Sequence, residues 1–198
     1  MHERRSRPLV LAGVLALLAM TPPAHASAQA IPDARLAGLE WRLLGPFRAG
    51  WGTMAAGVPD LPDTFYFGAA GGGVWKTRDA GASWQPMSNG LDDAAIGAIA
   101  IAPTDPDVIY AGSGQPEPRY DIAAGNGLYR STDGGAHWQH AGLAATRHIG
   151  AILVDAKDPD TVLVGALGHI FGPNPERGVF RSTDGGKSWT KTLYIDDN

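Results

Sequence analysis

One nine-residue pattern occurs three times in this chain and limits its possible folds more than any other feature. The second and third copies read RSTDGGAHW and RSTDGGKSW, and an earlier, looser copy reads KTRDAGASW. Asp79 precedes Asp133 by 54 residues, and Asp133 precedes Asp184 by 51. A pattern that recurs at an interval of this length indicates one supersecondary unit used three times.

Each repeat contains four short runs rich in valine, isoleucine and aromatic residues, separated by Gly-rich loops and Asp-Gly turns. Four short antiparallel strands per repeat are typical of a β-propeller blade. A β-sandwich also has short strands, but it does not place one turn sequence at the same strand position in every repeat. We therefore predict an all-β fold, a β-propeller segment of three four-stranded antiparallel blades, with the repeated turn between strands three and four.

The repeated turn has a structural explanation. Its aspartate can accept hydrogen bonds from backbone N–H groups, and the serine or threonine two positions earlier can bond locally. Its glycine permits a positive φ, and its tryptophan buries a large ring. We expect the following residues to shape the three turns rather than to form a functional site: Thr77, Asp79, Gly81, Trp84, Ser131, Asp133, Gly135, Trp138, Ser182, Asp184, Gly186 and Trp189.

The S/T-x-D-x-G-x-x-W pattern resembles the Asp-box, or BNR repeat, of sialidases, xyloglucanase-type glycoside hydrolases and sortilin-like proteins. The segments WRLLGPFRAG, GGGVWKTRDAGASW, YAGSGQPEPR and LGHIFGPNPERGVFRSTDGGKSWTKTLYIDDN extend the resemblance over residues 40–198. There the chain looks like the start of large bacterial exported proteins, described as sortilin-N-terminal-like or "glycosyl hydrolase" BNR-repeat proteins. The resemblance implies the propeller fold, and it implies that the Asp-boxes lie away from any catalytic centre.

The resembled proteins are several times longer than this chain, and closed propellers have about four to eight blades. We therefore expect the N-terminal portion of a longer protein, with its remaining blades as partners; the alternative is that copies of the chain associate to close a ring.

The first thirty residues have the form of a secretory signal peptide. A positively charged start, MHERRSRP, precedes the apolar run Leu9–Met20 and the small residues of AHASAQA. An uncleaved anchor is the alternative. We predict a signal peptide at 1–30, a lead-in at 31–45, and blades at 46–91, 92–143 and 144–198, with export to the periplasm or the cell exterior and no membrane contact after signal cleavage.

Composition excludes several classes of site. A net charge of −4 gives no basic surface for nucleic acid. The chain has no cysteine, which excludes disulfides and thiolate metal ligands. We expect no cofactor and no metal.

The connections between strands indicate where a ligand would bind. In an up-and-down sheet successive connections alternate ends, so the repeated turns lie at one end of each blade and the long loops at the other. Long loops on a rigid scaffold are where binding residues concentrate. We expect this loop rim to recognise a protein, peptide or glycan, through Arg48, Gln115, Arg119, Arg147, His148, His169, Asn174 and Arg177.

Part of a glycoside hydrolase, sialidase-like or xyloglucanase-like, is the alternative function. Such chemistry needs two carboxylates beside the scissile bond. The long loops contain three acidic residues, Glu117, Asp121 and Glu176, and the sequence does not identify which of them, if any, is catalytic. Two residues depart from the resembled families. In the resembled exported proteins the loop after the second strand of the repeat often reads GSGEP, and Gln115 stands here in place of that glutamate. Gly50 stands where the F-R-x-P segment of sialidases has its proline.

Overall fold

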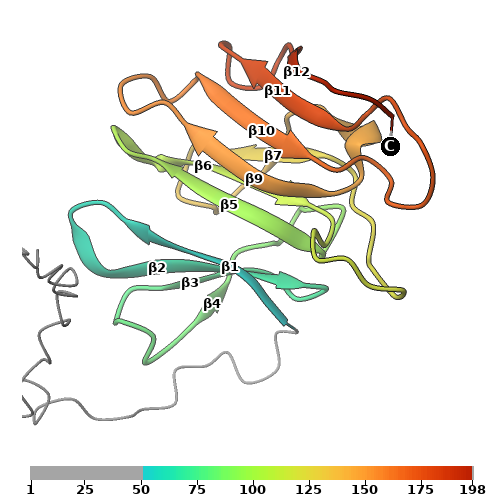
Figure 1. Ribbon diagram of the computed structural model, residues 1–198. Helices are drawn as coiled ribbons and strands as arrows, with labels where there is room; N and C mark the ends of the chain where they lie inside the picture. The colour runs from blue at the N-terminus through green and yellow to red at the C-terminus, as the bar shows by residue number, and fades with distance from the viewer. Residues whose placement is uncertain (1–50, 198) are drawn as a thin grey trace, which may run out of the picture. The chain divides into compact units, whose positions relative to one another are not determined.

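The computed structural model describes residues 51–197, which form twelve β-strands and one short 3-10 helix, η1 (Ala144–Thr146). The strands make three four-stranded antiparallel sheets, each a meander in chain order (Figure 1). The predicted all-β fold of three four-stranded blades is confirmed. The predicted signal peptide, the lead-in and Arg48 lie outside the described residues. Among residues 51–197, no helix is long and apolar enough to cross a membrane.

The strands of each sheet are short and follow one another directly. The first sheet comprises β1 (Trp51–Val58), β2 (Leu61–Ala70), β3 (Gly73–Thr77) and β4 (Gln85–Pro86). The second comprises β5 (Ile96–Ala102), β6 (Asp105–Ser113), β7 (Leu128–Ser131) and β8 (Gln139–His140). The third comprises β9 (Ile149–Val154), β10 (Val162–Ala166), β11 (Gly178–Ser182) and β12 (Thr190–Leu193).

The middle sheet packs against both of its neighbours. Because alternate side chains of a strand point to opposite faces, Ile109 and Ala111 of β6 join the apolar cluster shared with the first sheet. Val108 and Tyr110 join the cluster shared with the third sheet. The apolar run VIYAGS in β6 is therefore buried on both faces, which explains why it lacks the alternation of a half-exposed strand.

Three equivalent hydrogen bonds place the repeated turns beside the connections between strands one and two. Ala80 N–H donates to the Asp63 carbonyl oxygen (2.9 Å), Gly134 N–H to Asp107 (3.0 Å) and Gly185 N–H to Asp160 (2.9 Å). We call this the turn end of the sheets, and the opposite end, with the long β6–β7 and β10–β11 loops, the loop end.

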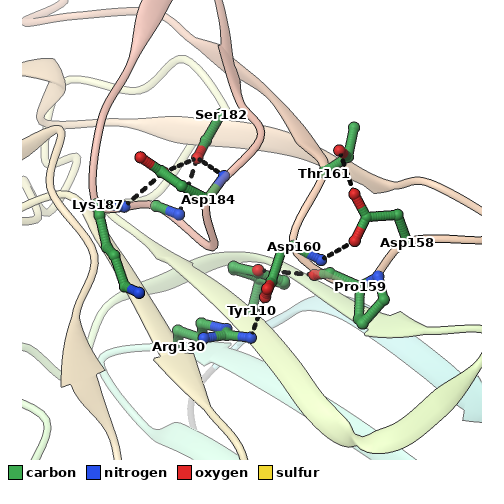
Figure 2. Close-up of polar contacts among 10 residues, drawn as sticks. Tyr110, Arg130, Asp158, Pro159, Asp160, Thr161, Ser182, Asp184 and Lys187 are labelled. Atoms are coloured by element: carbon green, nitrogen blue, oxygen red, sulfur yellow. Dashed lines mark hydrogen bonds and ion pairs between the residues drawn. The ribbon is translucent and has the colours of Figure 1, made fainter.

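The second and third sheets are also joined at the turn end by side chains (Figure 2). The hydroxyl of Tyr110 donates to the carbonyl oxygen of Pro159 at 2.8 Å. Arg130 on β7 forms an ion pair with Asp160, and its guanidinium lies over the Tyr110 ring, 5.8 Å from the centroid. These contacts join the second sheet to the third at the turn end.

Candidate functional site

The three repeated turns use their polar groups internally. In each turn a hydroxyl donates to the aspartate: Thr77 to Asp79 at 2.7 Å, Ser131 to Asp133 at 2.8 Å and Ser182 to Asp184 at 2.7 Å. The same hydroxyls accept the backbone N–H of Gly81, Gly135 and Gly186 at 2.8 to 2.9 Å. The carboxylates have few lone pairs left for a ligand, so the turn end is not the candidate site.

The β6–β7 loop at the loop end is held in one conformation by backbone contacts. Gln115 N–H donates to the Ala123 carbonyl oxygen at 2.9 Å, which closes the loop on itself. Gly125 N–H donates to the Arg147 carbonyl oxygen at 2.7 Å, which ties it to the connection between the second and third sheets. At Gly114, φ is +87° and a Cβ would lie 1.9 Å from the Arg147 oxygen, so this approach requires glycine.

A depression of about 240 Å³ lies where this loop meets the first sheet. Its lining residues come from the start of β1, the end of β2 and the loop: Trp51, Ala70, Gly71, Gln115, Asp121 and Ala123. Three of the six have no side chain larger than a methyl group, so much of the lining is backbone, and the polar chemistry comes from Gln115 and Asp121.

Gln115, one of the lining residues, carries a buried side-chain hydrogen-bond donor. The residue is 5 % exposed, and among the described residues its Nε2 has no hydrogen-bond partner. Its carbonyl oxygen accepts from His148 Nδ1 at 2.9 Å, so the backbone of Gln115 is fixed while the side-chain amide is not paired. An unpaired buried donor costs about 1–3 kcal/mol.

Arg119 lies beside the depression and contacts two of its lining residues, Trp51 and Asp121. The guanidinium carbon of Arg119 lies over the indole of Trp51, 3.7 Å from the ring centroid. Arg119 Nε donates to Asp121 Oδ1 at 2.9 Å, and this hydrogen bond lowers the pKa of the Asp121 carboxyl. Trp51 remains 52 % exposed and the neighbouring Tyr120 90 % exposed, so both rings are accessible from solvent.

Two other predicted binding residues support the loops. His148 is buried, and burial lowers the pKa of its imidazole. Its carbonyl oxygen accepts from Leu167 N–H at 2.9 Å, which joins the connection after η1 to the third sheet. Arg147 is exposed and has a φ of +58°, uncommon for a residue with a side chain. The side chain of Arg147 does not line the depression, although its carbonyl holds Gly125.

The predicted residues of the β10–β11 loop are held within that loop. Asn174 is buried; its Nδ2 donates to the His169 carbonyl oxygen at 2.7 Å, and its Oδ1 accepts from Glu176 N–H at 3.1 Å. Arg177 Nε donates to the Leu167 carbonyl oxygen at 2.9 Å. Both Asn174 and Arg177 therefore have structural partners that the sequence did not suggest.

The structure thus places Gln115 and Asp121 in the lining of one depression, with Arg119 beside it in contact with Asp121. Glu117 is exposed on the same loop and Glu176 half-buried on the next, and neither lines the depression. Trp51 was missed among the sequence candidates. The sequence did contain a signal for Trp51, which is a large aromatic residue in the GPFRAGWG segment at the start of a strand. In that segment only Arg48 was named as a binding candidate.

Comparison with known proteins gives a family match that covers more than half of the chain. The model of the Sortilin-Vps10 family, described as sortilin, neurotensin receptor 3, matches residues 72–195. A xyloglucanase of Paenibacillus sp is 31 % identical over 132 residues, which is 61 % of this chain and 12 % of the xyloglucanase. The chain therefore spans about an eighth of that relative's length.

Solved structures show the same fold. An ancestral GH74 enzyme superposes with a TM-score of 0.61 at 22 % identity, covering 79 % of this chain and 20 % of that one. The GH74 xyloglucanase of Xanthomonas campestris superposes with a TM-score of 0.53 at 25 % identity, covering 77 % and 22 %.

Proposed function

Because the chain belongs to the Sortilin-Vps10 family of β-propellers, we propose that it is an exported binding module that holds a glycan at the loop end of its first two blades. The observation that carries the proposal is the depression beside Trp51, where the buried amide of Gln115 has no partner among residues 51–197. Binding sites combine an apolar surface with a few polar groups that fix orientation. Here Trp51 supplies the surface, and Gln115 and Asp121 supply the polar groups.

The choice of a glycan over a peptide or a protein has two supports. The lining of the depression includes one amide residue and one carboxylate residue beside an aromatic residue, a combination that suits the hydroxyl groups and apolar ring faces of sugars. In addition, two relatives of this chain are xyloglucanases, so proteins with similar sequences act on a polysaccharide.

Calorimetric titration of the 198-residue chain with xyloglucan oligosaccharides tests the proposal. Gln115→Met removes the amide and keeps the side-chain length, and we expect it to weaken binding about tenfold, the loss of one well-made hydrogen bond. Lys187→Ala, at the turn end, is the matched control and should bind as the natural chain does. Equal affinities of the two variants would mean that the ligand binds elsewhere on the chain. Binding of peptides from a library, without binding of any oligosaccharide, would mean that the ligand is a peptide and not a glycan.

Participation in a glycoside hydrolase is the second candidate, favoured by the two xyloglucanase relatives. A hydrolytic site requires two carboxylates about 5–9.5 Å apart, and Asp121 is the one carboxylate among the residues that line the depression. Release of reducing ends from xyloglucan, lost when Glu117, Asp121 and Glu176 are changed together to amides, would support the enzyme. Binding without turnover in either form would support the module.

A further inference from the structure

We propose that the outer face of the third sheet binds the first sheet of a second copy of this chain, with Arg181 of one copy paired to Asp63 of the other. The outer face is the one that carries Leu153, Leu163 and Arg181. The pairing needs no ligand and does not involve the loop end, so it is independent of the proposed glycan binding.

The three sheets carry equivalent rows of side chains on one face. Each row is a set of direct neighbours across the four strands, with one residue from each strand, and such neighbours lie on the same face of a sheet. The third residue of every row is basic. The rows are Ala56, Tyr66, Lys76 and Gln85 in the first sheet; Ala100, Tyr110, Arg130 and Gln139 in the second; and Leu153, Leu163, Arg181 and Thr190 in the third.

The first two rows contact the turn end of the sheet that follows. The Tyr66 hydroxyl donates to the Gly134 carbonyl oxygen at 2.7 Å, and Lys76 Nζ donates to the same oxygen at 3.3 Å. Tyr110 and Arg130 of the second row bond to the connection between strands one and two of the third sheet. A row of this kind is therefore one half of a contact between two sheets.

The third row keeps the basic residue but changes the residues beside it. Arg181 is exposed, and among residues 51–197 it forms no ion pair. Leu153, which is 65 % exposed, stands where the other rows have alanine, and Leu163 stands where they have tyrosine. Leucine has no hydroxyl to donate. The outer face therefore suits a partner that supplies a carboxylate to Arg181 and an apolar surface beside it.

A hollow of about 150 Å³ lies at Arg181. An arginine can bind a carboxylate through two parallel hydrogen bonds. The hydroxyls of Ser182 and Ser188 in the lining donate to Asp184, so Arg181 is the main group that a carboxylate can bind there. The other lining residues are Thr183, Thr190 and Thr192.

The first sheet presents a carboxylate and an apolar group on its connection between strands one and two. This connection reads Leu-Pro-Asp, whereas the other two sheets have Asp-Pro-Asp. Leu61, which is 49 % exposed, therefore stands where the others have an aspartate. Asp63 is exposed and occupies the position of Asp160, the residue that pairs with Arg130. The connection thus supplies the groups that the outer face fits.

The first sheet also carries an exposed phenylalanine on the side where a preceding sheet would pack. By its strand register Phe65 occupies the position of Ile109 in the second sheet. Ile109 packs in the cluster shared with the preceding sheet, whereas Phe65 is 37 % exposed. The leucines of the outer face can therefore pack on Phe65 when the first sheet of a second copy takes the place of a following sheet.

Charge favours this arrangement over the contact of two outer faces with each other. Two outer faces would bring two Arg181 side chains together, and like charges across an interface oppose binding. Arg181 against Asp63 is complementary, so the copies associate head to tail. Two copies supply six sheets, within the about four to eight blades of closed propellers. We therefore expect a discrete dimer with two equivalent contacts.

Sedimentation equilibrium of the 198-residue chain, without ligand and at about 1–100 μM, tests the proposal. The natural chain should form a dimer. Arg181→Glu and Asp63→Arg should each weaken the dimer at least about tenfold, because each places like charges across both contacts. Arg147→Glu is the control: it changes the net charge as much as Arg181→Glu, lies outside the strands and should dimerise as the natural chain does. Circular dichroism checks that each variant is folded.

An equimolar mixture of Arg181→Glu and Asp63→Arg tests the pairing itself. In a mixed dimer, one contact joins the introduced glutamate to the introduced arginine, and the other joins the natural Arg181 to the natural Asp63. The mixture should therefore form dimers although neither variant does so alone.

Each outcome bears on one part of the proposal. A natural chain that is monomeric at every concentration would overturn self-association. Dimers that survive both charge reversals would overturn the pairing of Arg181 with Asp63, and loss without recovery in the mixture would overturn the head-to-tail contact. Larger assemblies that follow the same pattern would support the contact and overturn the closed dimer. None of these results depends on whether the chain binds a glycan.

Discussion

The indole N–H of Trp189 donates a hydrogen bond to the carbonyl oxygen of Ala141, 2.8 Å away in the preceding sheet. Trp138 makes the equivalent bond one sheet earlier, to the Met87 carbonyl oxygen at 2.6 Å. In both cases the tryptophan of a repeated turn bonds to the residue that directly follows the fourth strand of the sheet before it. The repeated sequence therefore shapes its own turn and also joins two sheets.

This relationship predicts the effect of removing one indole N–H. Trp189→Phe keeps most of the apolar ring but leaves the carbonyl of Ala141, a buried residue, without this donor. We expect the free energy of unfolding to fall by about 1–3 kcal/mol, measured by urea denaturation. Trp75→Phe is the control, because Trp75 bonds to Gly72 within its own hairpin, and it should cost less. Equal decreases in the free energy of unfolding for the two variants would mean that the hydrogen bond between the sheets contributes no more to stability than the bond within a hairpin.

A second prediction concerns the strained copy of the turn. Ala80 has a φ of +53°, whereas the other two turns have glycine here, Gly134 at +66° and Gly185 at +73°. A left-handed conformation costs a residue with a Cβ about 1–2 kcal/mol. Glycine avoids this strain, but its greater conformational entropy in the unfolded state offsets about 0.5–1 kcal/mol of the stabilisation. We expect Ala80→Gly to stabilise the chain by about 0.5–1 kcal/mol in thermal or urea unfolding.

The reverse substitution in the second turn provides the control for Ala80→Gly. Gly134→Ala introduces the same strain, and its Cβ would lie 3.2 Å from Lys76 Nζ. We expect it to destabilise the chain by at least as much as Ala80→Gly stabilises it. Destabilisation by both substitutions would contradict the strain argument and would mean that the methyl group of Ala80 contributes packing.

A third prediction follows from the ionisation of the turn aspartates. Hydrogen bonds from Ser83 lower the pKa of Asp79 to about 2, and those from His137 lower the pKa of Asp133 to about 2. Bonds from Ser188 lower the pKa of Asp184 well below its usual range. Since each folded-state pKa lies below the unfolded value of about 3.9, the stabilisation is complete above pH 4 and is lost as the pH falls toward 2.

Urea midpoints measured between pH 7 and pH 2 check this expectation. The natural chain should lose stability below pH 4, and Asp133→Asn should be less stable than the natural chain at pH 7 but lose less between pH 4 and pH 2. Asp155→Asn, outside the three repeated turns, should preserve the acid dependence of the natural chain. An unchanged acid slope in Asp133→Asn would show that other groups control acid unfolding.

The sequence predicted the sheets better than it predicted the site, for physical reasons. The repeat imposes the same local chemistry three times, so strand order and turn position could be inferred without knowledge of distant contacts. The Asp105–Asp107 segment belongs to β6, because Ala102 pairs with Asp105 and the turn between β5 and β6 is reduced to the two residues between them.

The site depends on contacts between segments that no local pattern encodes. Gln115, Arg119 and Asp121 were candidates because they lie on one long loop, and the structure places them together. Asn174 was a candidate for the same reason, but its amide is used by His169 and Glu176 within its own loop. Trp51 became relevant only when the loop folded back over the start of β1, a contact between residues far apart in the sequence.

The last prediction concerns the cost of keeping Gln115 ready for a ligand. Because Gln115 Nε2 is buried without a partner among residues 51–197, replacing it with an apolar side chain of similar length should remove an unsatisfied donor and lose no bond made by that atom. We expect Gln115→Met to raise the free energy of unfolding by about 1 kcal/mol, measured by urea denaturation without ligand. Gln115→Glu is the contrasting variant; it buries a carboxylate and should lower stability. Destabilisation by methionine would mean that the amide has a structural role, and the depression would lose its main claim to be a binding site.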